Sequence, residues 1–168
     1  MFHIVAGSAD PGNIESSIRS SVPLSQIKEA CPPEIFHNLE LLYPSGHFYC
    51  WALSTSDKYK KSFPLIQSGD PILLKPNKQK EKHFFAWLGK IVYTTDRCPE
   101  LGQLLWKSGK EWKRLLFLDS IEEVKIPDYT ISKKLGLKEN FRYSYTVIQE
   151  LLENIDEFYT FCRTSASI

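Results

Sequence analysis

Four segments of this chain have the pattern of β-strands, and they restrict the fold more than any other feature. Apolar and aromatic residues dominate all four, and turn residues lie between them. They are HFYCWALS at 47–54, PILLKP at 71–76, HFFAWLGKIVYTT at 83–95 and WKRLLFLDSIEEVKIP at 112–127, which we expect to contain a turn. Strands joined in this way favour a small, mostly antiparallel sheet.

Helical patterns lie around these strands. SQIKEAC (25–31) predicts a short helix, PEIFHNLELL (33–42) a second helix with proline at its start, and ISKKLGL (131–137) a third that ends at Gly136. The clearest pattern is C-terminal, where Thr146 and Gln149 have the spacing of a capping box. One apolar helical stripe follows, made by Val147, Ile148, Leu151, Leu152, Ile155, Phe158 and Tyr159. The fold class is therefore α+β: a small, mostly antiparallel β-barrel flanked by helices, with an amphipathic C-terminal helix.

Length and composition indicate a globular protein without a membrane segment. The 168 residues suffice for one domain with a core. The sequence contains no apolar run of about 18 residues and no basic segment followed by a long apolar stretch, so we expect neither a membrane span nor a signal peptide. The four cysteines form no CxxC pair, which favours free thiols and a reducing, cytoplasmic location.

Motifs for catalysis or for metal binding are missing from the sequence. It contains no GxSxG, P-loop or dinucleotide fingerprint, and the four histidines lack metal-ligand spacing. We therefore expect no metal and no cofactor, and we favour a binding module over an enzyme.

The positive charge is concentrated in the middle of the chain. Residues 58–114 contain 13 basic and 5 acidic side chains, a net charge of +8, whereas the flanking segments are net negative. Tryptophan, tyrosine and phenylalanine occur in the same block. Cations for phosphates and rings for unstacked bases are what a nucleic-acid surface requires. The alternative is a set of lysines on solvated strands and turns.

The order of several segments resembles the YTH and EVE domains of the PUA-like superfamily, which read modified bases. The matching pieces are WALSTSD (51–57), SGDPILL (68–74), FFAWLGKIVYTT (84–95), LWKSGKEWKRLLFLDSIEEVKIP (105–127) and FRYSYTVIQELLENI (141–155). The similarity extends over about residues 47–160 and concerns order and pattern. It implies a base-reading domain at 47–161, preceded by an N-terminal helical extension at 1–46 and followed by a linker or tail at 162–168.

The resemblance also implies a set of binding residues. In such domains a base swung out of its strand is held in an aromatic cage. Trp106 and Trp112 would be two walls, with Tyr59 or Phe63 as a third. Polar contacts to the base edge would come from Ser54, Ser56 and Asp57. The candidates for phosphate contacts are Lys58, Lys60, Lys61, Lys75, Lys78, Lys80, Lys82, Lys107 and Lys110.

Each site residue also has a purely structural interpretation. We expect residues 99–109 to form a loop with one helical turn at ELGQLL (100–105), and Trp106 can anchor this loop. Trp112 can pack beneath the strand that it begins, and Asp57 can cap the following turn. Trp51 and Trp87 lie in apolar strands and are expected in the core.

Three functions are compatible with the resemblance. The first is recognition of a modified base in DNA, most simply N6-methyladenine, as in the N-terminal domains of McrB-like restriction proteins. There the partners would be a GTPase domain of the same longer chain and a nuclease subunit. The second is recognition of N6-methyladenine in RNA by a YTH-type domain. The third is a PUA- or ASCH-like enzyme that acts on a nucleotide.

Overall fold

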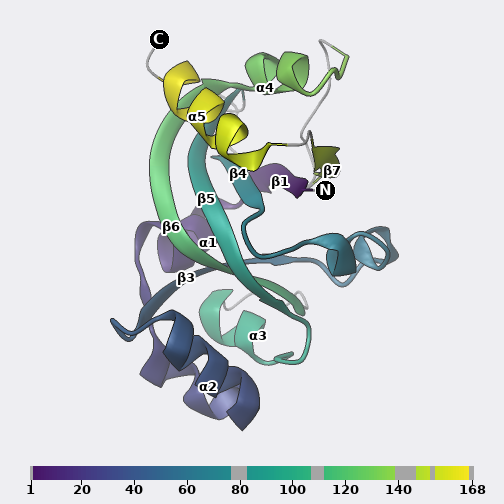
Figure 1. The fold of residues 1–168 in the computed structure, drawn as a ribbon. Helices are drawn as coiled ribbons and strands as arrows, with labels where there is room; N and C mark the ends of the chain where they lie inside the picture. Colours follow the sequence, from purple (N-terminus) through teal and green to yellow (C-terminus); the bar gives the residue numbers. More distant parts are fainter. Residues whose placement is uncertain (1, 77–82, 107–111, 139–146, 152–153, 167–168) are drawn as a thin grey trace. The chain divides into compact units, whose positions relative to one another are not determined.

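The computed structural model describes residues 2–76, 83–106, 112–138, 147–151 and 154–166, and it confirms the α+β class (Figure 1). The strands are β1 (Phe2–Ala9), β2 (Val22–Pro23), β3 (His47–Leu53), β4 (Pro71–Pro76), β5 (Phe84–Thr95), β6 (Arg114–Pro127) and β7 (Val147–Leu151). The α-helices are α1 (Pro11–Ile14), α2 (Pro33–Leu42), α3 (Leu101–Trp106), α4 (Asp128–Lys134) and α5 (Ile155–Ser165). A π-helix at Glu15–Arg19 follows α1, and a 3-10 helix occupies Leu24–Ala30.

The strand order is β2-β3-β6-β5-β4-β1-β7. The sheet is mixed, because β1 and β4 run parallel while β1 and β7, β2 and β3, β3 and β6, and β4 and β5 pair antiparallel. The order has two ends, so the described strands form an open sheet and not the closed barrel that we predicted. Closure requires pairing of the end strands, and β2, at one end, is only two residues long.

The chain divides into two compact units. Unit 1 comprises Met1–Pro11, Gly69–Lys90 and Ile121–Ile168, and unit 2 comprises Gly12–Ser68 and Ile91–Ser120. Both units contain residues from before and after position 46, so their limits differ from the predicted boundaries. The division into an extension at 1–46, a base-reading domain at 47–161 and a linker or tail at 162–168 stays a prediction.

Unit 2 has its core between the β3–β6 pair and the helices. Alternate residues of a strand point to the same face, and Cys50 and Ala52 of β3 lie opposite Phe117 and Leu115 of β6. The core residues from the helices include Ile35, Leu39, Leu101, Leu105 and Trp106. The Tyr43 hydroxyl ties the end of α2 to the sheet by donating to the Leu118 carbonyl at 2.8 Å.

Unit 1 is centred on β4, which lies between β1 and β5 and is buried along its whole length. Leu73 of β4 packs with residues of β1, β5, β6, α4 and α5 in one apolar cluster. Helix α5 contributes Phe158, Tyr159 and Cys162 to this cluster. The buried Asp70, just before β4, accepts a hydrogen bond from the His3 backbone N–H at 3.1 Å.

The predicted helix from Val147 is wrong in its first half. Residues 147–151 instead form β7, which pairs with β1. Helix α5 begins after Asn154, whose side chain accepts a hydrogen bond from the Glu157 N–H at 3.2 Å. The β-branched residues at the start of the apolar stripe suit a strand as well as a helix, and pairing with β1 satisfies their backbone groups.

The N-terminal segment and β6 also differ from the sequence-based expectation. Residues 2–9, within the predicted helical extension, form β1. The segment 114–127 is one continuous strand without the expected turn. The short helix predicted at 25–31 is a 3-10 helix, and the helical turn considered after Pro99 is α3.

Candidate functional site

Residues 54–56, which we call the serine turn, follow β3 and are held in place by Arg114. Leu53 and Arg114 form the final pair in the β3–β6 register, so both segments leave the sheet at the same end. The Arg114 guanidinium donates to the carbonyl oxygens of Ser54 and Ser56, at 2.7 and 2.8 Å. The Ser54 hydroxyl donates to that of Ser56 at 3.1 Å. Because hydrogen bonds from a charged donor are strong, this turn has a defined geometry.

Three tryptophans form a row at the same end of the β3–β6 pair. The ring centroids of Trp51 and Trp106 are 6.1 Å apart, those of Trp106 and Trp112 are 6.3 Å apart, and both contacts are edge-to-face. The Trp106 indole N–H donates to the Ser17 hydroxyl at 3.1 Å. Such contacts, with a satisfied indole donor, are typical of packed aromatic rings.

Burial distinguishes the two predicted cage walls. Trp106 closes α3 and is only 7% exposed, so it does not stand on an open loop as we expected. Trp112 is partly exposed and packs against the same apolar cluster as Trp106. The residues between them, 107–111, lie outside the described part of the chain. Trp106 is therefore the buried middle ring of the row, and Trp112 is the ring that retains exposed surface.

Gly102 lets the Trp112 backbone approach α3 closely. A Cβ atom at position 102 would lie 2.5 Å from the Trp112 carbonyl oxygen and 2.6 Å from its Cβ. Both contacts are shorter than van der Waals distance, so only glycine fits without a shift of the backbone. This packing fixes where the chain enters β6.

The other cage candidates occupy the short 3-10 helices after β3. Asp57 begins the helix Asp57–Tyr59 and is exposed, as are Lys58, Lys60 and Lys61. Tyr59 and Phe63 are buried, and the Lys58 ammonium lies 5.3 Å from the centre of the Tyr59 ring. Their role as a third wall stays a prediction.

Lys75 differs from the other phosphate candidates. It lies in β4, its side chain is 7% exposed, and its ammonium is 3.2 Å from the Asp128 carboxylate. The Lys75 ammonium is therefore paired and nearly buried, whereas Lys58, Lys60 and Lys61 are exposed, and its contact with a phosphate stays a prediction. The remaining candidates, Lys78, Lys80, Lys82, Lys107 and Lys110, lie outside the described residues.

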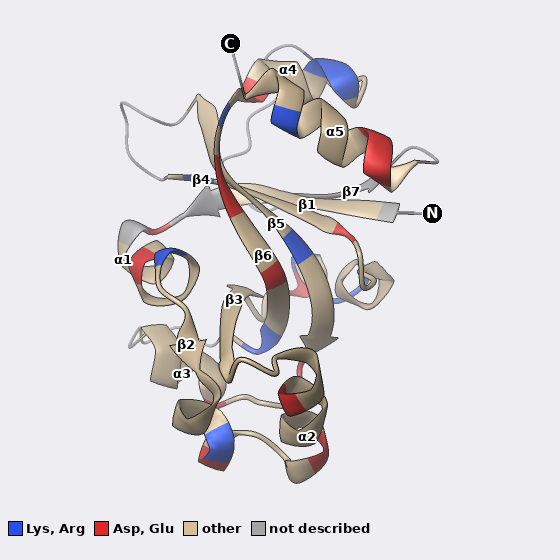
Figure 2. Ribbon diagram, turned by 60° about the vertical axis from the view of Figure 1, so that its left-hand side comes forward, with Lys and Arg blue, Asp and Glu red and all other residues tan. Residues whose placement is uncertain are grey.

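Charged side chains are mixed over the described elements. Figure 2 shows lysine and arginine on several strands and helices, with acidic residues among them. Five lysines of the block at 58–114 belong to residues drawn in grey. The electrostatic surface expected from that block is thus only partly described.

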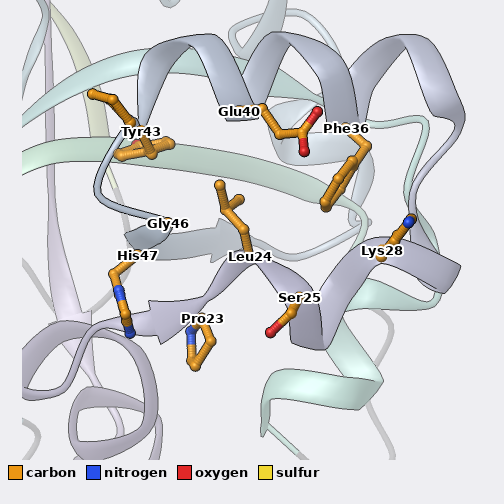
Figure 3. Close-up of a pocket in the computed structure, with 10 residues that line it drawn as sticks. Pro23, Leu24, Ser25, Lys28, Phe36, Glu40, Tyr43, Gly46 and His47 are labelled. Atoms are coloured by element: carbon orange, nitrogen blue, oxygen red, sulfur yellow. The ribbon is translucent and has the colours of Figure 1, made fainter.

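A separate pocket of about 530 Å³ lies in unit 2 beside α2 (Figure 3). Phe36, Glu40 and Tyr43 face it from the side of α2, and Leu24 and Lys28 from the 3-10 helix. Burial raises the pKa of Tyr43, whose hydroxyl is used by the Leu118 carbonyl. None of the predicted site residues lines this pocket.

Sequence reasoning missed three residues that build the site: Ser17, Gly102 and Arg114. Arg114 was counted only as part of the basic block, although its place beside the second tryptophan is visible in the sequence. Ser17 and Gly102 act through contacts between distant segments, for which the sequence has no local signal. Among the described residues no group of three potential metal ligands is found, no helix could cross a membrane, and all four cysteines are buried free thiols.

Comparisons with known proteins bear on the fold. No protein-family model matches the chain, and no curated protein matches it. Among solved structures, it is similar to the N-terminal domain of Thermococcus gammatolerans McrB bound to m5C DNA. The TM-score is 0.60 at 21% sequence identity, over 83% of this chain and 86% of the other. The chain therefore has the fold of an McrB N-terminal domain, as the resemblance in its sequence implied.

Proposed function

We propose that this chain is a binding module that recognises a methylated base in DNA. The observation that carries the proposal is the shared fold, because the similar McrB domain was solved bound to methylated DNA and the match covers most of both chains. The absence of a catalytic motif from the sequence favours binding over catalysis.

The residues at the end of β3 and the start of β6 supply rings and hydroxyl groups that support this proposal. We propose that Trp112 supplies a ring for the base, and that Trp106 supports it from behind. The turn held by Arg114 would present the hydroxyl groups of Ser54 and Ser56 to the base edge. Stacking on an aromatic ring contributes about 1–3 kcal/mol per base, which offsets the few kcal/mol needed to extrude a base from the duplex.

The methyl group then provides the discrimination. Burial of one methyl stabilises the complex by about 0.8 kcal/mol, and shape complementarity around it adds further preference. We propose N6-methyladenine as the modified base, extruded into the aromatic cage. The similar McrB domain has m5C in its DNA, so 5-methylcytosine is the base to compare it with. By the same analogy, the module would direct a GTPase and a nuclease to modified DNA.

The test is equilibrium binding to matched oligonucleotides. Duplexes of one sequence would carry N6-methyladenine, 5-methylcytosine or no modification, and a methylated RNA of the same sequence would be measured beside them. We expect the tightest binding to the duplex with N6-methyladenine. Tightest binding to the duplex with 5-methylcytosine would keep a methylated-DNA reader and replace the proposed base. Tightest binding to methylated RNA would replace the DNA proposal with an RNA reader, and equal binding to all would refute recognition of a modification.

Variants at position 112 connect this preference to the site. Trp112→Ala should reduce the preference for methylated DNA, whereas Trp112→Phe, which keeps a ring, should retain most of it. Trp87→Phe, at a buried position in unit 1, is the matched control and should leave the preference unchanged.

A further inference from the structure

A second pocket lies in unit 1, between α4 and α5. Its volume is about 450 Å³, and its lining is formed by Tyr129, Thr130, Lys133, Lys134 and Phe161. The lining thus combines two aromatic rings, two ammonium groups and two hydroxyls, without a carboxylate. Neither the base-reading site nor the predicted phosphate contacts include any of these residues.

Helix geometry places the ring and the cation of this pocket on one face. Tyr129 and Lys133 are four residues apart on α4, so their side chains are neighbours on the helix surface. Tyr129 is 63% exposed, so its ring is open to solvent and to a ligand. Lys133 is exposed as well.

Phe161 forms the opposite wall of the pocket. Phe161 of α5 packs against the apolar cluster of unit 1, and the Lys134 ammonium lies 5.1 Å from the centre of its ring. Lys134 is also 3.8 Å from the Glu157 carboxylate, a contact that is too long and too exposed to neutralise it fully. Figure 1 shows α4 and α5 close to each other.

We propose that this pocket binds one nucleotide of a nucleic acid outside the base-reading site. The base would stack on Tyr129, and the phosphate would be held by Lys133 and Lys134. A ring beside cations suits a nucleotide because both of its parts, an aromatic base and an anionic phosphate, find a partner. The inference rests on the proposed function in taking nucleic acid as the ligand, but it requires no base modification.

The test uses unmethylated single-stranded DNA, so that preference for a modified base plays no part. Tyr129→Ala should weaken binding about tenfold through lost stacking, whereas Tyr129→Phe should bind like the unaltered chain. Lys133→Ala should reduce the slope of log affinity against log salt concentration by about 0.7, the value for one phosphate contact on a single strand. Lys90→Ala removes an exposed lysine from β5 and is the charge-matched control, for which no change is expected.

Since Tyr129 and Lys133 are exposed, these variants should fold normally, and their melting temperatures check this. Unchanged affinity in both Tyr129→Ala and Lys133→Ala would overturn the proposal. An equal effect of Tyr129→Ala on binding of an abasic strand of the same length would also overturn it, because the ring would then act without stacking on a base.

The outcome can be separated from that of the proposed function. The ratio of affinities for methylated and unmethylated duplex should be the same in Tyr129→Ala as in the unaltered chain. If the chain shows no methylation preference but Tyr129→Ala still weakens single-strand binding, the proposed function fails while the pocket assignment stands.

Discussion

Replacement of Trp106 by alanine should destabilise the fold rather than only weaken binding. Only 7% of the Trp106 surface is exposed. The indole packs edge-on against Trp51 and Trp112 and donates a hydrogen bond to the Ser17 hydroxyl. Truncation of a buried tryptophan costs about 3–5 kcal/mol in the free energy of unfolding. Ser17 keeps one partner, because its hydroxyl donates to the Asn13 carbonyl at 3.2 Å, so the lost hydrogen bond should add little to the effect.

The assay is urea denaturation followed by far-ultraviolet circular dichroism, which does not depend on tryptophan fluorescence. Trp106→Phe is the matched control: it keeps a ring but leaves unfilled volume, and we expect a loss of about 1–3 kcal/mol. Trp112→Ala, at a partly exposed position, should lose less stability than Trp106→Ala. A loss below about 1 kcal/mol for Trp106→Ala, together with abolished preference for methylated DNA, would refute the assignment of Trp106 as the supporting ring.

Three further predictions concern packing, the serine turn and pH. Gly102→Ala should lower the free energy of unfolding by about 1–3 kcal/mol because its Cβ would collide with Trp112, and calorimetry measures this. Arg114→Ala should speed hydrogen exchange in the turn after β3, because the carbonyls of Ser54 and Ser56 lose the Arg114 Nη1 donor from which both accept. Hydrogen bonds from Arg163 lower the pKa of Glu122 below its ordinary value near 4.5. The ion pair therefore stabilises the fold above that pH, and this stabilisation is lost as the pH falls through the lowered pKa. Glu122→Gln should flatten the acid limb of a curve of unfolding free energy against pH.

The sequence predicted elements with a strong local pattern. PEIFHNLELL forms α2 at Pro33–Leu42, and the strand segments form β3, β4 and β5 within a residue or two of the expected limits. The segment of β6 is also extended, but it lacks the turn that we expected within it. Trp51 and Trp87 are buried as expected. In these segments, propensity and apolar periodicity indicate the same structure, so tertiary contacts had nothing to override.

Long-range pairing explains the elements that were missed. Strand β1 runs parallel to β4, with Val5 opposite Ile72, and antiparallel to β7, with Val5 opposite Ile148. No local pattern reports such partners. The apolar stripe after Thr146 satisfied the helical spacing, but its first residues belong to a strand, and the true helix signal was Asn154 with Glu157 three residues later.

The sequence predicted the residue types of the candidate site but not how deeply each side chain is buried. The two tryptophans and the serine turn do lie at one end of the β3–β6 pair. The sequence placed Trp106 in a loop, however, because the pattern around Gly109 suggested a turn and the helical turn before it was weak. Its burial depends on Ser17 and Trp51, which come from remote parts of the chain.

The central claim is that this fold reads a methylated base, and the most direct test is the ratio of two dissociation constants. Methylated and unmethylated duplexes of one sequence would be compared in a competition titration at a low and a high salt concentration. Raising the salt should weaken binding to both duplexes through their phosphate contacts. We expect the methylated duplex to bind more tightly at both concentrations and the ratio to stay constant, because the base pocket carries the discrimination. A ratio of one at both concentrations would contradict it.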